Sequence, residues 1–287
     1  MHEMLHEGNT EQMLAESCRK VGEHLYVKPG AEISVADVGN VKKENLQIVF
    51  SMGGCGTRLK HITKDEYSKH LIQVNGKPIS KHVVDLWLSS GFTNFCFLID
   101  NTHRGKSVAE YYKDGKQLGA EIKYSVEHTK LSSGGAIRQA IETGAITKSF
   151  INHYPDDLIV NYPNFADDFA KIFISAMRAG YQCVIVCVPG KLYPYGVIED
   201  KDGKVANFVE KPFIPKDTNT GIFGMSEKAF SLIKQLEPDK EIKIERTVLK
   251  QIAQNGKMLK VLLPTEYWIP VNDVLNLNKF AEIVKKK

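Results

Sequence analysis

Residues 47–69 read QIVFSMGGCGTRLKHITKDEYSK, and this stretch decides how the rest of the chain is interpreted. A short apolar run at 48–50 predicts a strand at 47–51, and a glycine-rich turn follows it at once. Glycine lets a backbone approach a bound group closely, and consecutive turn N–H groups form an anion-binding hollow. Arg58 and Lys69 bring positive charge near that hollow. The stretch therefore predicts a site for a polyphosphate.

Outward from this strand, predicted strands alternate with predicted helices. Strand-like runs follow at 94–100, 120–127, 150–160, 182–188, 219–225 and 257–264. Helical patterns lie at 78–90, 108–112, 134–143, 165–179, 227–236, 244–255 and 274–286. This alternation is typical of an α/β fold in which a mainly parallel mixed sheet has helices on both faces. Alternating apolar and polar residues around Asp202-Gly203 predict a small antiparallel insertion, a hairpin beside that sheet.

Residues 1–46 form an N-terminal extension ahead of the domain at 47–287. Apolar residues at helical spacing between Glu11 and Leu25 predict an amphipathic helix, and Pro29-Gly30 ends it. A short irregular segment follows. We expect the extension either to pack on the domain or to make a contact between copies in a homo-oligomer.

Composition narrows the class of protein. The 287 residues carry a net charge of +4, and their basic side chains are dispersed, so we expect no nucleic-acid partner. Five cysteines without framework spacing favour a reducing compartment, and Cys96, Cys183 and Cys187 lie in apolar runs typical of a core. The first residues resemble no signal peptide, and no stretch approaches the length of a membrane span. We therefore expect a cytoplasmic protein without a membrane partner.

The stretch EHTKLSSGGAIRQAI at 127–141 is a second candidate binding element. Glycines at a helix N-terminus offer N–H groups to an anion or a base edge. Glu127 precedes them, and a carboxylate can only accept hydrogen bonds. Guanine presents two adjacent donors, whereas adenine and cytosine present one amino donor beside an acceptor nitrogen. Glu127 therefore favours guanine, the other interpretation being a solvated residue at a strand end.

A carboxylate follows the predicted strand that begins near residue 150. Ligands and ions bind at the carboxyl ends of such strands, where Asp156 lies, with Asp157 as the adjacent alternative. Triphosphate chemistry requires a divalent cation, usually Mg²⁺ held by one or two carboxylates and phosphate oxygens. We therefore expect Mg²⁺ as the cofactor.

In this order, the motifs resemble those of the sugar-1-phosphate nucleotidyltransferases, also called NDP-sugar pyrophosphorylases. The matching elements are the strand with GGxGTR and a later Lys, the loop at 127–141, the PDD element, and EKP at 210–212. The resemblance covers roughly residues 46–280 and is closest in pattern to mannose- and heptose-1-phosphate guanylyltransferases. It implies a Rossmann-like fold and the reaction of a nucleoside triphosphate with a sugar 1-phosphate to give NDP-sugar and pyrophosphate. The identity of Glu127 indicates that this triphosphate is GTP.

The resemblance also implies a role for each matching residue. Arg58 would hold the triphosphate and the departing pyrophosphate, Lys69 would stabilise charge around the α-phosphate, and Lys211 would orient the incoming phosphate. Mg²⁺ would be held by Asp156. Further contacts to the nucleotide would come from Met52, Gly53, Gly54, Cys55, Gly56, Thr57, Glu127, Ser133 and Gly134. The sugar phosphate would contact Tyr195, Gly196, Glu210, Lys211, Asn219 and Thr220.

The closing segment departs from the family pattern. Where the family often has W-x-D-x-G-T with a second metal-binding Asp, this chain has WIPVND at 268–273, and Pro270 offers no ligand. Asp273 is then the expected second ligand, with Asp157 as the alternative. Two other functions stay open: a non-catalytic regulatory homologue that binds nucleotide sugars, and a nucleotidyltransferase for a non-sugar phosphate acceptor, which would include CTP-dependent enzymes.

Overall fold

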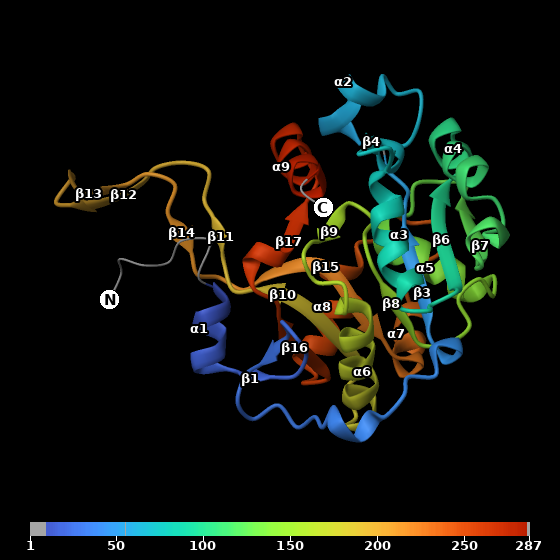
Figure 1. Cartoon of the computed structure of the whole chain (residues 1–287), viewed down its shortest axis with the longest axis horizontal. Helices are drawn as coiled ribbons and strands as arrows, with labels where there is room; N and C mark the ends of the chain where they lie inside the picture. Colours follow the sequence, from blue (N-terminus) through green and yellow to red (C-terminus); the bar gives the residue numbers. More distant parts are fainter. Residues whose placement is uncertain (1–9, 55, 286–287) are drawn as a thin grey trace.

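A single large sheet forms the centre of the protein, whose computed structural model describes residues 10–54 and 56–285 (Figure 1). Within these residues the sheet has nine strands in the order β1-β2-β16-β10-β15-β8-β3-β6-β7. In chain order they are β1 (Arg19–Lys20), β2 (Tyr26–Val27), β3 (Gln47–Ser51), β6 (Asn94–Asp100), β7 (Glu121–Glu127), β8 (Phe150–Asn152), β10 (Cys183–Val188), β15 (Thr218–Met225) and β16 (Met258–Leu262).

The predicted mainly parallel mixed sheet is confirmed. Strand β3 pairs in parallel with β6 and β8, β6 with β7, and β10 with β16. Strand β15 lies antiparallel between β8 and β10. The glycine-rich turn after β3 therefore lies at the edge where β6, β7 and β8 also end.

Helices cover both faces of the sheet, as predicted. Successive side chains of a strand point to opposite faces, and in β3 Phe50 packs in one core cluster with Trp87, whereas Val49 packs in another with Ile137. The first cluster is completed by α3 (Ile79–Ser89), α4 (His103–Tyr112), α6 (Phe165–Arg178) and α9 (Val274–Lys285). The second is completed by α5 (Ser132–Glu142), α7 (Phe230–Lys234) and α8 (Val248–Gln254).

Three of the cysteines lie in this core, as their apolar surroundings predicted. Cys96, Cys183 and Cys187 are all buried. Burial raises the pKa of the Cys96 thiol to about 12, so it stays protonated. No helix within residues 10–54 and 56–285 combines the length and apolar character of a membrane span.

The N-terminal extension packs on the edge of the sheet, which was one of its two expected placements. Its helix α1 is shorter than predicted and covers only Thr10–Ser17, because the chain then turns into β1 and β2. Tyr26 of β2 pairs with β16, and its hydroxyl donates to the carboxylate of Glu11 at 3.1 Å. Tyr267, from the far end of the chain, donates to the same carboxylate at 3.1 Å. Strands β1 and β2 pair as a hairpin, so the prediction of a helix is wrong from Cys18 to Leu25.

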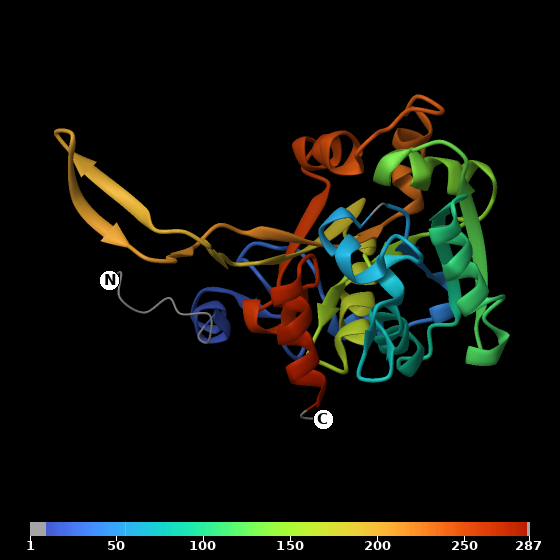
Figure 2. The ribbon, with the colours of Figure 1, turned by 90° about the horizontal axis from the view of Figure 1, so that it is seen from above.

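The predicted hairpin insertion is present but does not lie beside the sheet. Strands β12 (Val197–Lys201) and β13 (Lys204–Val209) pair around Asp202-Gly203, both with positive φ. Strands β11 (Lys191–Leu192) and β14 (Phe213–Ile214) pair at the base. Figure 2 shows the whole arm, residues 189–217, projecting from the body of the molecule. Nearly every side chain of β12 and β13 is exposed.

Candidate active site

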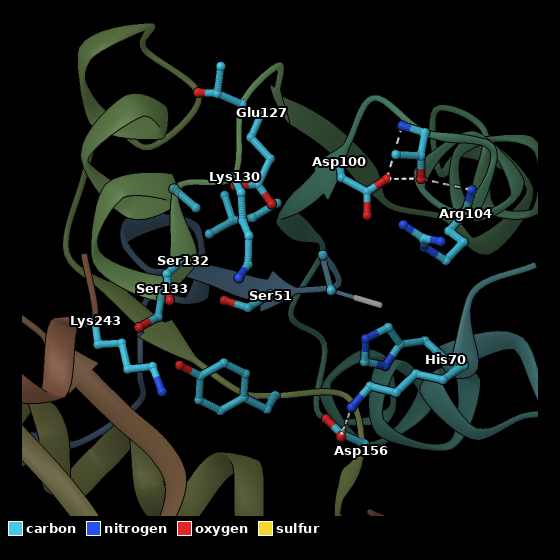
Figure 3. Close-up of a pocket in the computed structure, with 18 of the residues that line it drawn as sticks. Ser51, His70, Asp100, Arg104, Glu127, Lys130, Ser132, Ser133, Asp156 and Lys243 are labelled. Atoms are coloured by element: carbon cyan, nitrogen blue, oxygen red, sulfur yellow. Dashed lines mark hydrogen bonds and ion pairs between the residues drawn. The ribbon is translucent and has the colours of Figure 1, made fainter. Parts of the chain in front are cut away.

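A cavity of about 820 Å³ opens at the carboxyl edge of the parallel strands. Ser51, Asp100 and Glu127 are the last residues of β3, β6 and β7, and all three line it. In an open α/β sheet this edge is where ligands bind, because side chains and loop N–H groups converge there. Figure 3 shows these three side chains around one open space, with Asp156 on its opposite side.

A buried ion pair forms one side of the cavity. The ammonium group of Lys69 contacts the carboxylate of Asp156, and these side chains are only 19% and 11% exposed. Burial opposes ionisation of Asp156, but the positive charge of Lys69 outweighs it and lowers the pKa of that carboxyl below its usual value. Gly56 has φ +55°, and a Cβ there would lie 3.1 Å from the Cβ of Lys69. The glycine-rich turn therefore packs tightly against Lys69.

Asp157, next along the chain, is an anchor for the closing segment. It begins β9 (Asp157–Ile159), which pairs with β17 (Trp268–Pro270) so that Pro270 lies opposite Asp157. The indole N–H of Trp268 donates to the carboxylate of Asp157 at 3.1 Å. Burial, reinforced by the charge of Asp156, raises the pKa of Asp157 well above its usual value. A carboxyl group that favours its neutral form is a poor metal ligand.

The structure does not place Asp273 for its predicted role as second metal ligand. Asp273 is exposed, and its Oδ1 accepts a hydrogen bond at 2.8 Å from the backbone N–H of Asn276, in the first turn of α9. Asn272 lines the cavity instead. The pairing of β17 with β9 sets this register, so the carboxylate points to the helix rather than to Asp156.

The first turn of α5 is held by another segment of the chain. The Ser133 hydroxyl donates to Glu245 at 3.0 Å, and the Gly134 N–H donates to the carbonyl of Ile242 at 2.7 Å. Gly134 is buried and its N–H is already used, so the predicted hydrogen bond from this N–H to a base edge is not available. Ser133 does line the cavity, together with Glu127, whose Oε2 accepts from the Leu131 N–H at 2.9 Å.

Residues 48–286 match the model of the nucleotidyl transferase family. The chain belongs to this family. The bifunctional protein GlmU of Methanococcus maripaludis is 28% identical over 244 residues, which cover 81% of this chain and 54% of that protein. D-glycero-alpha-D-manno-heptose 1-phosphate guanylyltransferase of Campylobacter jejuni is 27% identical over 189 residues, which cover 65% of this chain and 78% of that protein. The chain thus spans about half the length of GlmU.

A solved structure supports the fold of this nucleotidyl transferase. UDP-glucose pyrophosphorylase, crystallised with UDP-glucose, superposes with a TM-score of 0.62 at 16% identity and covers 84% of this chain and 98% of its own. The superposition confirms the Rossmann-like fold, and the family match together with the guanylyltransferase relative confirms the resemblance to sugar-1-phosphate nucleotidyltransferases.

Sequence reasoning missed several residues of the nucleotidyl transferase cavity. Lys243 and Arg246 enter from the segment after α7, and Arg104 from the start of α4. In Figure 3, Lys243 and Arg104 point into the space from opposite sides. The charged run KEIKIER at 240–246 was the available signal for the first two. Arg104 lies in no recognisable sequence motif. In the structure its guanidinium donates a hydrogen bond to the carboxylate of Asp65 at 2.9 Å.

Part of the predicted nucleotide-binding set lies outside the cavity. Gly53 and Gly54 line it, but Thr57 and Arg58 are exposed and do not. Met52 is buried in the core and donates its N–H to the Leu98 carbonyl at 2.8 Å. Cys55 lies outside the described residues. The triphosphate role of Arg58 stays a prediction.

The predicted sugar-binding residues are not brought to the cavity. Tyr195, Gly196, Glu210 and Lys211 belong to the projecting arm, and the side chains of Glu210 and Lys211 are 62% and 64% exposed. The remaining two, Asn219 and Thr220 of β15, use their side chains within the fold: Asn219 accepts from the Gly221 N–H at 2.8 Å, and Thr220 donates to Val186 at 2.9 Å. Their predicted contacts with sugar stay untested.

The variant Asp273→Ala tests whether this carboxylate caps α9 or binds the metal. We expect it to lower the free energy of unfolding by about 1 kcal/mol, because a helix loses its N-terminal cap. Nucleotidyl transfer should stay within twofold, roughly, since surface changes away from a site leave it intact. Urea denaturation and a pyrophosphate-release assay measure the two quantities. Glu282→Ala, an exposed change on the same helix, is the control. Loss of Mg²⁺-dependent transfer at unchanged stability would restore Asp273 as a ligand.

Proposed function

We propose that the protein joins a nucleoside triphosphate to a sugar 1-phosphate, giving an NDP-sugar and pyrophosphate. The observation that carries the proposal is the shared cavity, which is lined by the glycine-rich turn, the buried Lys69–Asp156 pair and Glu127. The family match and the guanylyltransferase among its relatives support the reaction class. Pyrophosphate release on mixing triphosphate with a panel of sugar 1-phosphates tests it.

The reaction needs positioning and charge neutralisation rather than a protein nucleophile. An oxygen of the sugar phosphate attacks the α-phosphorus in line, and the bond from that phosphorus to the β-phosphate oxygen breaks. Pyrophosphate leaves with the electron pair of that bond. In our proposal Lys69 donates hydrogen bonds to the α-phosphate, where negative charge rearranges in the transition state. The side chain of Lys69 is only 19% exposed, so little water screens this interaction.

Asp156 is the residue that we propose to hold Mg²⁺. Among the described residues, no group of three or more His, Cys, Asp or Glu side chains is arranged to bind a metal. Mg²⁺ commonly takes only one or two carboxylates and completes its shell with phosphate oxygens and water, so the single ionised Asp156 fits this mode. When bound there, the ion neutralises phosphate charge. Asn272 is a further oxygen-bearing side chain on the cavity wall.

Guanine is the base that we propose for the nucleotide. Glu127 points into the cavity in Figure 3, and its Oε2 accepts one hydrogen bond from Leu131, so Oε1 and the second lone pair of Oε2 can accept from a ligand. Burial raises the pKa of Glu127. The hydrogen bond from the Leu131 N–H lowers this pKa in part, and the charge of Asp100 raises it further. A ligand that brings two donors to the carboxylate would stabilise its charged form. Guanine supplies such donors at N1 and N2.

The variant Glu127→Gln tests the base. We expect kcat/KM for GTP to fall at least about tenfold, because a hydrogen bond to a charged acceptor is lost. UTP and dTTP should improve relative to GTP, since an amide both donates and accepts. Pyrophosphate release with each triphosphate measures the change, and Glu121→Gln at the exposed start of β7 is the control. Equal or better turnover of UTP or dTTP by the unaltered protein would overturn the guanine assignment.

A second candidate is transfer to a phosphate acceptor that is not a sugar, and the position of the arm favours it. Tyr195 and Lys211, which the sugar reaction would use, lie on the arm and do not line the cavity. Pyrophosphate release with phosphorylated alcohols and amino acids, compared with sugar 1-phosphates, separates the two acceptors. A regulatory homologue would bind nucleotide sugars and release no pyrophosphate with any acceptor.

A further inference from the structure

His70 is a buried side chain of the cavity wall that the proposed reaction does not yet use. It follows Lys69 directly and is 2% exposed. Neither ring nitrogen has a hydrogen-bond partner within the described part of the chain. A buried polar group without a partner carries an unrecovered desolvation penalty, and folded proteins rarely retain one without a reason.

The other buried histidine of the core shows how this chain satisfies an imidazole with a structural role. His153 is fully buried, yet its Nδ1 accepts from the Trp87 indole at 3.0 Å and its Nε2 lies 2.6 Å from the Asp157 carbonyl. Both nitrogens of that ring are therefore used within the fold. His70 has the same burial without those partners, so packing alone does not explain it.

The surroundings of His70 identify the chemistry of a ligand. In Figure 3 its ring faces the cavity, with Arg104 on one side and Asp156 on the other. The ammonium group of Lys69 contacts that Asp156 carboxylate. Burial, and then the charge of Lys69, lower the pKa of His70 to about 4, so the ring is neutral near pH 7 and carries one N–H donor. A donor between two cationic side chains suits an anionic oxygen.

We propose that His70 is a substrate-binding residue that donates an imidazole hydrogen bond to a phosphate oxygen of the bound nucleoside triphosphate. The identity of this ligand rests on the proposed function. A bound phosphate would then accept the hydrogen bond that the fold itself does not satisfy, so that Lys69, His70 and Arg104 together contact the polyphosphate. Pre-placed donors of this kind contribute to affinity because little reorganisation is needed.

The variants His70→Phe and His70→Asn test the proposal. Titration calorimetry without an acceptor gives the affinities for GTP and for inorganic pyrophosphate, and thermal unfolding without ligand gives the stability. We expect His70→Phe to weaken both affinities about tenfold, because one hydrogen bond is lost. The unfolding temperature should be at least that of the unaltered protein, since a buried unpartnered polar group has been removed. His70→Asn, whose amide still donates, should bind within about threefold, and exposed His61→Phe is the surface control.

The outcomes separate a binding role from a structural one. Weaker binding by a His70→Phe protein that is as stable as the original, with recovery in His70→Asn, supports the proposal. Unchanged affinity in His70→Phe overturns it, and so does a fall in unfolding temperature with weak binding in both variants. If the unaltered protein binds pyrophosphate but no nucleoside triphosphate, the proposed function fails, while the pyrophosphate titrations still decide the role of His70. Binding of neither ligand overturns both.

Discussion

Asp156→Asn is expected to lower nucleotidyl transfer at least about 100-fold, the usual effect of removing one group that stabilises charge in a transition state. The carboxylate has two proposed partners, the bound Mg²⁺ and Lys69. Its side chain is only 11% exposed, so water cannot replace it easily. The neutral amide is similar in shape, which confines the change largely to charge. Pyrophosphate release at saturating triphosphate measures the effect.

Lys69→Met and the double variant separate catalysis from stability. Removing one partner of a buried ion pair leaves an uncompensated charge and destabilises a protein by about 3–5 kcal/mol. Each single variant should show this loss in urea denaturation. The double variant Lys69→Met/Asp156→Asn removes both charges and should recover most of the stability, but transfer should stay low. Double-mutant cycles are suited to this, because the two residues are in contact.

An exposed ion pair provides the matched control. The ammonium nitrogen of Lys60 lies 3.2 Å from a carboxylate oxygen of Asp65, and the Lys60 side chain is 58% exposed. Such a pair contributes about 0–1 kcal/mol, so Lys60→Met should leave both stability and transfer nearly unchanged. If the double variant regained activity along with stability, the Lys69–Asp156 pair would be structural and the catalytic assignment would be wrong.

Strands buried on both faces were predicted from the sequence with little error. The runs at 47–51 and 94–100 coincide with β3 and β6, because a continuous apolar run between turn signals has few other placements in an α/β fold. The glycine-rich turn and Asp156 follow strands that end at the same edge, and Lys69 lines the same cavity. For the strands around the cavity, the apolar pattern of the sequence and the topology of the sheet therefore lead to the same placement.

The errors lie where contacts between distant residues decide the structure. Apolar spacing favoured a helix through residue 25, but Glu11 binds Tyr26 and Tyr267, which requires a hairpin. The direction of the arm could not be read from its turn residues, which fix only the pairing of β12 with β13. The role of Asp273 depended on the register of β17 against β9. Local periodicity carries no information about these pairings.

The sequence also offered no signal for His70 and Gly105. The first follows Lys69 without belonging to a motif, and only its buried, unpartnered ring marks it. The second lies inside α4, where glycine is ordinarily a poor choice because it lowers helix stability by about 1 kcal/mol relative to alanine. In the folded protein Gly105 is buried against the end of β6. Its role is therefore visible only from the packing of the helix.

Gly105→Ala is expected to destabilise the protein through packing rather than through charge. A Cβ at this position would lie 1.8 Å from the carbonyl oxygen of Asp100. The obstacle is backbone rather than a flexible side chain, so either α4 or the end of β6 has to move. Movement of α4 is resisted by Val108 and Tyr112, which are fully buried, and by the hydrogen bond of 2.7 Å between the hydroxyls of Tyr112 and Ser80.

The two effects of this substitution have opposite signs, and their sizes decide the outcome. Alanine adds about 1 kcal/mol through helix propensity, whereas overpacking of a rigid core costs about 3 kcal/mol. Urea denaturation should therefore show a net loss of about 2 kcal/mol, the difference of these values. Lys106→Ala, an exposed change on the same helix, should be nearly neutral. A stabilised Gly105→Ala protein would mean that α4 does not pack on Asp100 as described.

The same displacement has a consequence for the site. Thr102 caps α4, its N–H donates to Asp100 at 2.9 Å, and both residues line the cavity. Movement of the helix would shift this wall and Arg104 with it. We therefore expect Gly105→Ala to weaken triphosphate binding at temperatures where the protein is still folded, whereas Lys106→Ala should not. Calorimetric titration with GTP measures this, and unchanged affinity in a destabilised protein would show that the cavity wall is set by β6 alone.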